Sequence, residues 1–319
     1  MRLPRRLRVI LAAALLAGVA GGVSVGSPAQ AYDLCFNHFP TIVITSPGTY
    51  NGTAGNDIVV IKHPSGMVTY NPVGGHDEIC RNGTSGTFTV LSAGLGHKIA
   101  AGGPTGVIIY GSDGPDDIGG SSGNDVIKGN GGDDIIWGYG GDDYIRGNGG
   151  DDVIFDEMGN NCLLGGDGKD RITGGSGNDT ILLGKENRFS DTQCAPDPSD
   201  NSPAAQAFRD SHYYVGGIAR GGSGNDIIYG TNGDDELDGG AGNDVINGFN
   251  GKDYITGGSG TDTVNGGHGD DRLTEYADNA IDYLYGGPGT DTFSAGDASD
   301  VCFPHWGPGT MTCGWNVTG

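Results

Sequence analysis

Aspartates that recur every nine residues give the chain its clearest chemical signal. From Tyr110 to Ile181 the phrase x-G-x-x-G-x-D-x-U is written eight times, with U a large apolar residue. We number its positions slot 1 to slot 9. Carboxylates repeated at a fixed interval offer many oxygen ligands of the kind that hard cations take. The slot-7 residues that we take as candidate metal ligands in this stretch are Asp116, Asp125, Asp134, Asp143, Asp152, Asp170 and Asp179, with Asn161 in the one missing place.

The same phrase resumes after a break, from Arg220 onward. Here the pattern is again followed closely, apart from two extra residues before the last three aspartates. The candidate ligands in this stretch are Asp226, Asp235, Asp244, Asp253, Asp262, Asp271, Asp282, Asp291 and Asp300.

The other slots indicate how the chain must fold to position these carboxylates. The glycines permit positive φ, so each repeat can turn sharply. The residues around U suffice only for a very short strand, with U pointing inward. One repeat then forms one turn and one strand, and two repeats complete a coil of eighteen residues. We therefore predict an all-β fold, a parallel β-roll (β-helix-like) solenoid whose coils stack about 4.8 Å apart.

Stacking of this kind gathers the aspartates into two rows, one with Asp116, Asp134, Asp152 and Asp170, the other with Asp125, Asp143, Asn161 and Asp179. Two carboxylates about 5 Å apart repel by roughly 0.8 kcal/mol even in water, and a divalent cation between coils reverses the sign. Several Ca2+ ions suit this geometry, because Mg2+ demands a tight octahedron and Zn2+ prefers His or Cys. The predicted cofactor is therefore Ca2+.

Three irregularities predict where the rows are weak. Asn161 is neutral, and its repeat lacks the slot-2 glycine, so we expect weak or empty sites between Asp143 and Asp179. The best sites should then lie on the row of Asp116. Eleven residues separate Asp271 from Asp282, which predicts a break in the stack.

The nonapeptide resembles the repeats-in-toxin (RTX), or haemolysin-type calcium-binding, family. That resemblance implies a secreted protein in which calcium lies between adjacent turns and takes aspartate side chains from both. Upstream, Gly52–Val60 is a further repeat with Asp57 in slot 7, and Gly74–Cys80 is a shortened one. The order of cysteine, strand, repeat and cysteine from Cys35 to Cys80 resembles the start of many exported members of the family.

The organisation that we predict has six parts. They are a signal peptide (1–31), a degenerate β-rich N-terminal cap (32–109), a first repeat block (110–181), an insertion loop (182–219), a second repeat block (220–302) and a C-terminal cap (303–319). The first part has a basic start, a short apolar run and Ala29-Gln30-Ala31, which is the form of a secretory signal, so we expect an extracellular protein without a membrane span.

The chain carries 40 acidic and 17 basic residues, a formal charge of -23. Such a charge disfavours nucleic acid as a partner. The six cysteines of an exported chain suggest disulfides, for which fifteen connectivities exist. We predict the nearest-neighbour set, Cys35–Cys80, Cys162–Cys194 and Cys302–Cys313.

Three functions follow from these features. The first is a secreted calcium-binding β-roll, non-catalytic, whose folding is coupled to extracellular calcium. The second is a calcium-dependent enzyme acting on polysaccharides, although an HExxH motif is absent and the Gly-Gly-Ser-Gly runs lack lipase spacing. The third is an adhesin or surface-matrix component with a glycan or cell-surface partner, suggested by outward apolar residues at Val126, Ile135, Trp137, Tyr139, Tyr144 and Val153.

Overall fold

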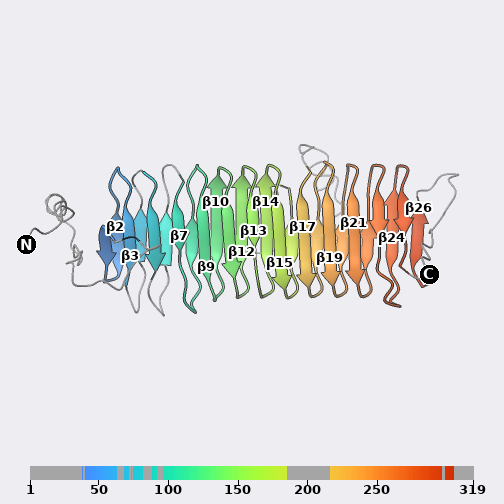
Figure 1. Cartoon of the computed structure of the whole chain (residues 1–319), viewed down its shortest axis with the longest axis horizontal. Coiled ribbons are helices and arrows are strands. Elements are labelled where there is room, and N and C mark those ends of the chain that lie inside the picture. Colours follow the sequence, from blue (N-terminus) through green and yellow to red (C-terminus); the bar gives the residue numbers. More distant parts are fainter. Residues whose placement is uncertain are drawn as a thin grey trace, which may run out of the picture.

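The computed structural model describes residues 38, 40–62, 68–71, 73, 75–81, 88–91, 96–184, 216–296 and 299–304. These residues form two parallel sheets of thirteen strands each, and successive strands along the chain alternate between the sheets. The strands stack along the long axis of the molecule in sequence order (Figure 1). The predicted all-β parallel solenoid is confirmed.

We call the two layers the odd sheet and the even sheet, after the numbers of their strands. The odd sheet contains β1 (Ile42–Ile44), β3 (Ile58–Ile61), β5 (Glu78–Arg81), β7 (Lys98–Ala100), β9 (Asp117–Ser121), β11 (Ile135–Tyr139), β13 (Val153–Phe155), β15 (Arg171–Ser176), β17 (Ile218–Ser223), β19 (Glu236–Ala241), β21 (Tyr254–Ser259), β23 (Arg272–Thr274) and β25 (Thr292–Ser294).

The even sheet contains β2 (Gly48–Asn51), β4 (Val68–Asn71), β6 (Phe88–Leu91), β8 (Ile108–Tyr110), β10 (Val126–Gly131), β12 (Tyr144–Gly149), β14 (Cys162–Asp167), β16 (Thr180–Leu182), β18 (Ile227–Tyr229), β20 (Val245–Asn247), β22 (Thr263–Asn265), β24 (Tyr283–Gly287) and β26 (Val301–Pro304). The residues that the structure describes include no helix long and apolar enough to cross a membrane.

The core is a single layer of slot-9 side chains between the sheets. Ile118 pairs with Ile136 in the odd sheet, and Ile127 pairs with Ile145 in the even sheet, so identical slots stack coil after coil. These side chains are fully buried and belong to one continuous cluster. The inward placement of U that the repeat predicts is therefore observed, and it fixes the register of the turns at both edges.

Two long departures from the nine-residue period leave this register intact. The strands upstream of Tyr110 join the same two sheets with wider coils, in which Val59 pairs with Ile79 and Ile79 with Ile99. Across residues 183–226, β16 pairs directly with β18, with Ile181 beside Ile228. The two repeat blocks are thus consecutive coils of one solenoid.

Candidate metal sites

The slot-7 residues form a hydrogen-bonded ladder along each edge of the solenoid. The backbone N–H of one slot-7 residue donates to the side-chain Oδ1 of the slot-7 residue one coil later, as from Asp134 to Asp152 at 2.9 Å and from Asp125 to Asp143 at 2.8 Å. We call the edge that leads into the odd sheet the odd row, and the edge that leads into the even sheet the even row. The structure therefore brings the predicted aspartates together coil by coil.

Every candidate ligand lies in one of these rows. The odd row contains Asp57, Asp77, His97, Asp116, Asp134, Asp152, Asp170, Gly217, Asp235, Asp253, Asp271 and Asp291. The even row contains Val107, Asp125, Asp143, Asn161, Asp179, Asp226, Asp244, Asp262, Asp282 and Asp300.

The second carboxylate oxygen of most row aspartates is buried without a hydrogen-bond partner. The Oδ2 atoms concerned belong to Asp77, Asp134, Asp143, Asp152, Asp170, Asp179, Asp226, Asp244, Asp253, Asp262, Asp271 and Asp282. A buried carboxylate oxygen with no donor is costly unless a cation or proton satisfies it. The same unpartnered oxygen recurs in successive coils, and oxygen atoms are the ligands that Ca2+ takes.

Slot 3 decides whether a turn leaves this oxygen open. In the repeats of Asp134, Asp143 and Asp152 the slot-3 residue has a left-handed backbone, with φ of 81° at Asn130, 77° at Tyr139 and 82° at Asn148. In each of these repeats the slot-7 Oδ2 lacks a partner. Glycine at slot 3 also has a left-handed backbone, as at Gly222 (φ 115°) and Gly240 (φ 105°), and the slot-7 Oδ2 of these repeats again lacks a partner. We call these open turns.

Serine or threonine at slot 3 closes the turn. The backbone N–H of Ser112 donates to Asp116 Oδ2 at 2.6 Å, and Ser121 and Thr231 do the same to Asp125 and Asp235. Their hydroxyls also donate to the same carboxylates, for example Ser121 Oγ to Asp125 Oδ1 at 2.8 Å. In such closed turns both carboxylate oxygens are already hydrogen bonded, and Thr53 with Asp57 forms another.

Slot-2 glycines keep the space beside the open oxygen clear. A Cβ on Gly129 would collide with Asp134 Oδ2 and lie 2.8 Å from the carbonyl oxygen of Gly147 in the next coil. The same holds for Gly147, where the clash is with Asp152 Oδ2 and the carbonyl of Gly165 at 2.8 Å. A carboxylate and a backbone carbonyl from successive coils thus converge on one point. Calcium accepts both kinds of oxygen, so the residues present fit this ion.

Burial raises the pKa of these carboxyl groups. The pKa of Asp134 and that of Asp253 rise to about 8, first because burial penalises the charged form and then because neighbouring aspartates repel it. The pKa values of Asp152 and Asp170 rise to about 7 for the same leading reason. Without a cation, burial therefore disfavours the charged form of these row aspartates.

Each row has its own interruption, although the stretch from Asp116 to Asp170 is complete. That the better sites lie on the row of Asp116 stays a prediction. Gly217 occupies the odd-row position between Asp170 and Asp235, and its N–H donates to Asp235 Oδ1 at 2.6 Å. A Cβ at Gly217 would lie 2.8 Å from the Asp170 carbonyl oxygen and 3.1 Å from a Leu183 methyl. The odd row therefore lacks a carboxylate there, and an aspartate would not fit.

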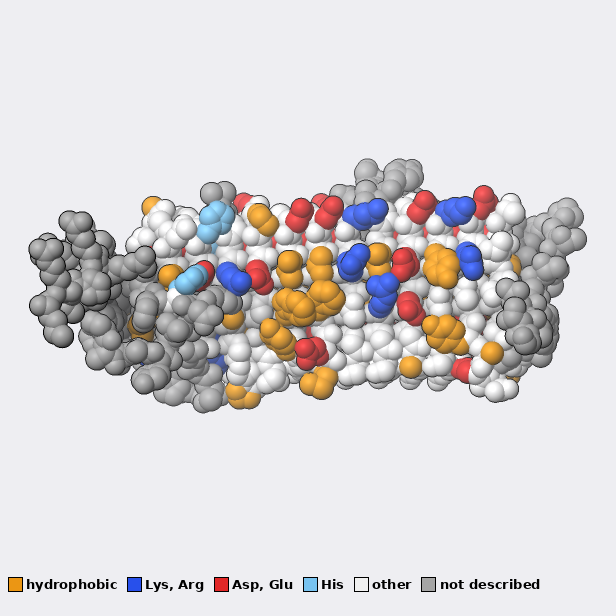
Figure 2. Space-filling model, in the orientation of Figure 1, with side chains coloured by type: hydrophobic (Ala, Val, Ile, Leu, Met, Phe, Trp, Pro, Cys, Tyr) orange, Lys and Arg blue, Asp and Glu red, His pale blue; other side chains and the backbone are white. Residues whose placement is uncertain are grey.

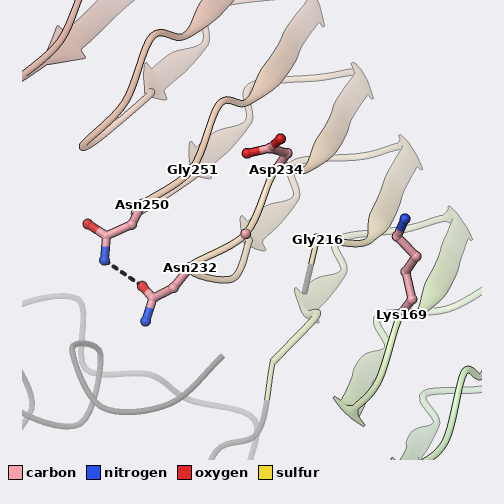
Figure 3. Close-up of a pocket in the computed structure, with 7 residues that line it drawn as sticks. Lys169, Gly216, Asn232, Asp234, Asn250 and Gly251 are labelled. Atoms are coloured by element: carbon pink, nitrogen blue, oxygen red, sulfur yellow. Dashed lines mark hydrogen bonds between the residues drawn. The ribbon is translucent and has the colours of Figure 1, made fainter. Parts of the chain in front are cut away.

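A shallow polar pocket lies at this gap. It is lined by Lys169, Gly216, Asn232, Asp234, Asn250 and Gly251, all at the turns of neighbouring coils (Figure 3). Asn250 Nδ2 donates to Asn232 Oδ1 at 2.8 Å across it. The pocket lies where Gly216 and the neighbouring Gly217 have no side chains.

A second, exposed ladder runs through slot 6, which the sequence presents as freely variable. Asn124 Oδ1 accepts from the N–H of Asp142 at 3.0 Å, and Asp142 Oδ1 accepts from the N–H of Asn160 at 2.8 Å. Here the side chain of the earlier coil accepts from the later one, the reverse of the slot-7 ladder. Together, the two ladders give each turn hydrogen bonds to the turns of the preceding and the following coil.

Three residues beside the rows are not found by a search for slot-7 aspartates alone. His97 stands in slot 7 of the odd row, where its Nδ1 accepts from the N–H of Asp77 at 3.1 Å and its buried Nε2 has no partner. Burial lowers its pKa. The sequence signal was the run His97-Lys98-Ile99, which keeps an apolar residue two positions after slot 7, although the nearest glycine, Gly96, stands in slot 6.

The other two are acids in slot 2, where glycine is the rule. Asp156 follows Ile154 by two residues and Glu275 follows Leu273 by two, and both are buried. The Asp156 carboxylate lies against Gly138, where Asp143 Oδ2 also converges, and burial together with this neighbour raises the pKa of Asp143. Asp156 thus provides a carboxylate in the coil in which Asn161 lacks one. The weak or empty site expected there stays a prediction.

The predicted break between Asp271 and Asp282 does not occur. The N–H of Asp262 donates to Asp282 Oδ1 at 2.8 Å, and β22 pairs with β24 so that Val264 lies beside Leu284. The two extra residues fall in the turn between β23 and β24 and leave the strands in register. The stack therefore continues to β26.

The predicted disulfides depend on Cys35, Cys194 and Cys313, which lie outside the described residues. Their predicted partners Cys80, Cys162 and Cys302 are all buried. Cys162 occupies slot 8 on the outer face of the even sheet, in a buried cluster with Tyr144, Leu164 and Leu182. The pairing stays a prediction.

One stretch, Gly119–Gly123, does match the GxSxG lipase spacing, although the Gly-Gly-Ser-Gly runs do not. Its Ser121 is buried, and its hydroxyl donates to Asp125 Oδ1 and to the carbonyl oxygen of Thr105 at 3.0 Å. No histidine is among these partners. The motif is a closed turn of the repeat and lacks the exposed serine of a nucleophile elbow.

The family model for the RTX calcium-binding nonapeptide repeat matches the chain several times. The matched segments are residues 110–145, 119–154, 146–181, 157–188, 220–248, 247–274 and 276–311, which together cover more than half of the chain. A search of curated proteins found no match to it.

Proposed function

Because the chain belongs to the RTX calcium-binding nonapeptide repeat family, we propose that it is a secreted, non-catalytic β-roll that binds several Ca2+ ions along both edges. The observation that carries the proposal is the buried, unpartnered Oδ2 atom that recurs in open turns such as those of Asp134, Asp143 and Asp152. Backbone carbonyls such as that of Gly147 supply further ligands from the next coil. The candidate ligands are the aspartates of the two rows, with the open turns as the sites that fill.

We further propose that calcium binding supplies the free energy for folding. Each coil buries carboxylates that repel one another, and the binding free energy of an ion becomes folding free energy when the apo site cannot form. Extracellular modules bind Ca2+ with dissociation constants of about 10⁻⁴–10⁻³ M. The chain would therefore fold after export, where calcium is abundant. The signal-like residues 1–31 support export, but they lie outside the described part of the chain.

The test is far-ultraviolet circular dichroism of the mature chain with calcium and with chelator, together with calorimetric titration. The proposal expects a β spectrum that appears with calcium and a stoichiometry of several ions per chain. A chain that binds no calcium at millimolar concentration would contradict it.

A second candidate function is suggested by the outer face of the odd sheet. Trp137 and Phe155 pair in neighbouring strands and stack with ring centroids 4.7 Å apart, and Tyr139 stacks on Trp137 at 6.5 Å. Exposed Ile135 and Met158 extend the surface. Figure 2 shows hydrophobic side chains gathered at the middle of the solenoid between charged ones.

Stacked aromatic rings on a rigid sheet suit a sugar ring or a surface partner. This candidate makes the protein an adhesin or a surface-matrix component in addition to a calcium binder. Glycan-array binding in saturating calcium checks it. Trp137→Ala should abolish binding there, whereas Tyr285→Ala, which removes the stack of Tyr285 on Phe303 at 4.6 Å in the even sheet, should not.

A further inference from the structure

Among the described residues, three buried carboxylates meet at one place on the edge that carries the even row. Oxygen atoms of Asp262, Glu275 and Asp282 all lie within 4.8 Å of one another. Their side chains come from two successive coils, because Asp262 precedes β22 while Glu275 and Asp282 flank the longer turn between β23 and β24. The exposed fractions of the three residues are 0%, 4% and 1%.

One oxygen on each of the three residues has no hydrogen-bond partner: Asp262 Oδ2, Glu275 Oε1 and Asp282 Oδ2. The remaining oxygens are engaged, since Glu275 Oε2 accepts from the N–H of Gly258 at 3.1 Å and Asp282 Oδ1 from that of Asp262 at 2.8 Å. These hydrogen bonds fix the carboxylates and aim the free oxygens into the shared space. In the part of the chain that the structure describes, no basic side chain pairs with them.

Glu275 distinguishes this place from the ordinary inter-coil sites. It stands in slot 2, and its carboxylate lies against Gly257 of the preceding coil, where coils with a slot-2 glycine present a backbone carbonyl. The turn of Asp262 is open, with φ of 119° at Gly258. A neutral ligand is thus replaced by a charged one at a site that already has two aspartates. Calcium affinity in proteins rises with the charge count and rigidity of the ligands.

We propose that Asp262, Glu275 and Asp282 form a three-carboxylate calcium site that binds more tightly than the regular inter-coil sites and fills first. The inference rests on the proposed function and adds a hierarchy to it. The site lies near the C-terminal end of the described solenoid, so the coils around β22 to β24 are the first that calcium orders. Coils toward β1 then add onto a template that is already formed.

Asp156 supplies a natural comparison. It is also a slot-2 acid in the even row, next to Asp143, but the following slot 7 is Asn161, so this place has two carboxylates and an amide. Asn161 Oδ1 already accepts from the N–H of Asp143 at 3.0 Å, a bond that an aspartate would keep. The two places therefore differ by one carboxylate charge, and a single substitution at Asn161 or Asp282 changes that charge count.

The experiment is a calcium titration of the full mature chain against a chromophoric chelator, with circular dichroism in saturating calcium to verify folding. Wild type should show one step at least about tenfold tighter than the rest. Glu275→Gly, which restores the slot-2 glycine of the repeat, should lose that step and keep the weaker ones. Asp156→Gly should retain it.

The reciprocal pair completes the test. Asp282→Asn should weaken the tight step, and Asn161→Asp should create a second one. Should Glu275→Gly fail to fold, Glu275→Gln removes the charge at nearly constant shape and carries the same expectation. A wild type with calcium steps of equal affinity, or a Glu275→Gln variant that keeps the tight step, overturns the three-carboxylate site. A wild type that binds no calcium instead overturns the proposed function itself.

Discussion

The backbone N–H of Asp179 donates to Oδ1 of Asp226 at 2.7 Å, although 47 residues separate the two in the chain. Within the regular coils the same bond joins residues eighteen apart, as from Asp226 to Asp244 at 2.8 Å. In the ladder, Asp226 therefore follows Asp179 directly, as a residue one coil later does. β15 pairs with β17 and β16 with β18 in the register of consecutive coils.

Excision of the insertion should therefore leave the solenoid intact. Removal of residues 185–213 places Asp226 eighteen residues after Asp179, the spacing of the regular coils. We expect a folded, calcium-binding protein, tested in a Cys162→Ser background so that no thiol is left without its predicted partner. Removal of 185–215 leaves too few residues for one coil and should break the pairing of β16 with β18. Equal melting temperatures for the two deletions would contradict this account.

Slot 3 should control the number of calcium ions bound. Asn148→Ser offers the closing hydroxyl and loses the preference for left-handed backbone, so the turn of Asp152 should close and one ion should be lost. Asn148→Gly keeps the turn open and is the control. In the opposite direction, Ser112→Gly should open the turn of Asp116 and add a site. Calorimetric stoichiometry measures all three, and an unchanged count in Asn148→Ser would argue against the distinction.

Slot 2 should tolerate no Cβ beside an open oxygen. Gly129→Ala places a methyl against Asp134 Oδ2 and the carbonyl of Gly147, so we expect loss of that ion and a lower melting temperature in calcium. Gly131→Ala in the same turn is the matched control, because a Cβ there meets nothing nearer than 3.5 Å and its φ is not left-handed. If both variants melt alike, steric exclusion at slot 2 is not the reason for the glycine.

Acid should partly replace calcium. The row aspartates have folded-state pKa values raised from the unfolded value of about 3.9 to about 6 at Asp226 and about 8 at Asp134, chiefly by burial. The folded state therefore binds more protons, so its stability is fully present below about pH 4 and falls as pH rises through the folded pKa values. In chelator, β structure should persist at pH 4 and be lost by pH 8. A calcium-free chain that is more stable at pH 8 than at pH 4 would reverse the sign.

The nine-residue period predicted most of this architecture because slot 9 determines which side chains enter the core and slot 7 determines which lie at the edge. A large apolar residue after every aspartate fixes the inward face, and the observed pairing of Ile127 with Ile145 is the consequence. The rows follow from that register. The aspartates named from sequence alone all stand in them.

What the period could not predict depends on contacts between coils. Local spacing suggested a break before Asp282, yet strand pairing restored the register because a turn at the edge can lengthen without moving the strands. The roles of Asp156 and Glu275 become visible only when the preceding coil is in place. Likewise, the closing of a turn by Ser112 depends on a backbone torsion that the repeat pattern does not reveal.

The most direct test of the central claim is circular dichroism of the mature chain at pH 7.5, titrated with calcium from a chelated start. The account predicts that β structure appears with calcium, that calorimetry over the same range counts several ions, and that chelator reverses both. A β spectrum that is complete in chelator and unchanged by calcium would contradict the coupling between the unpartnered aspartate oxygens and the fold.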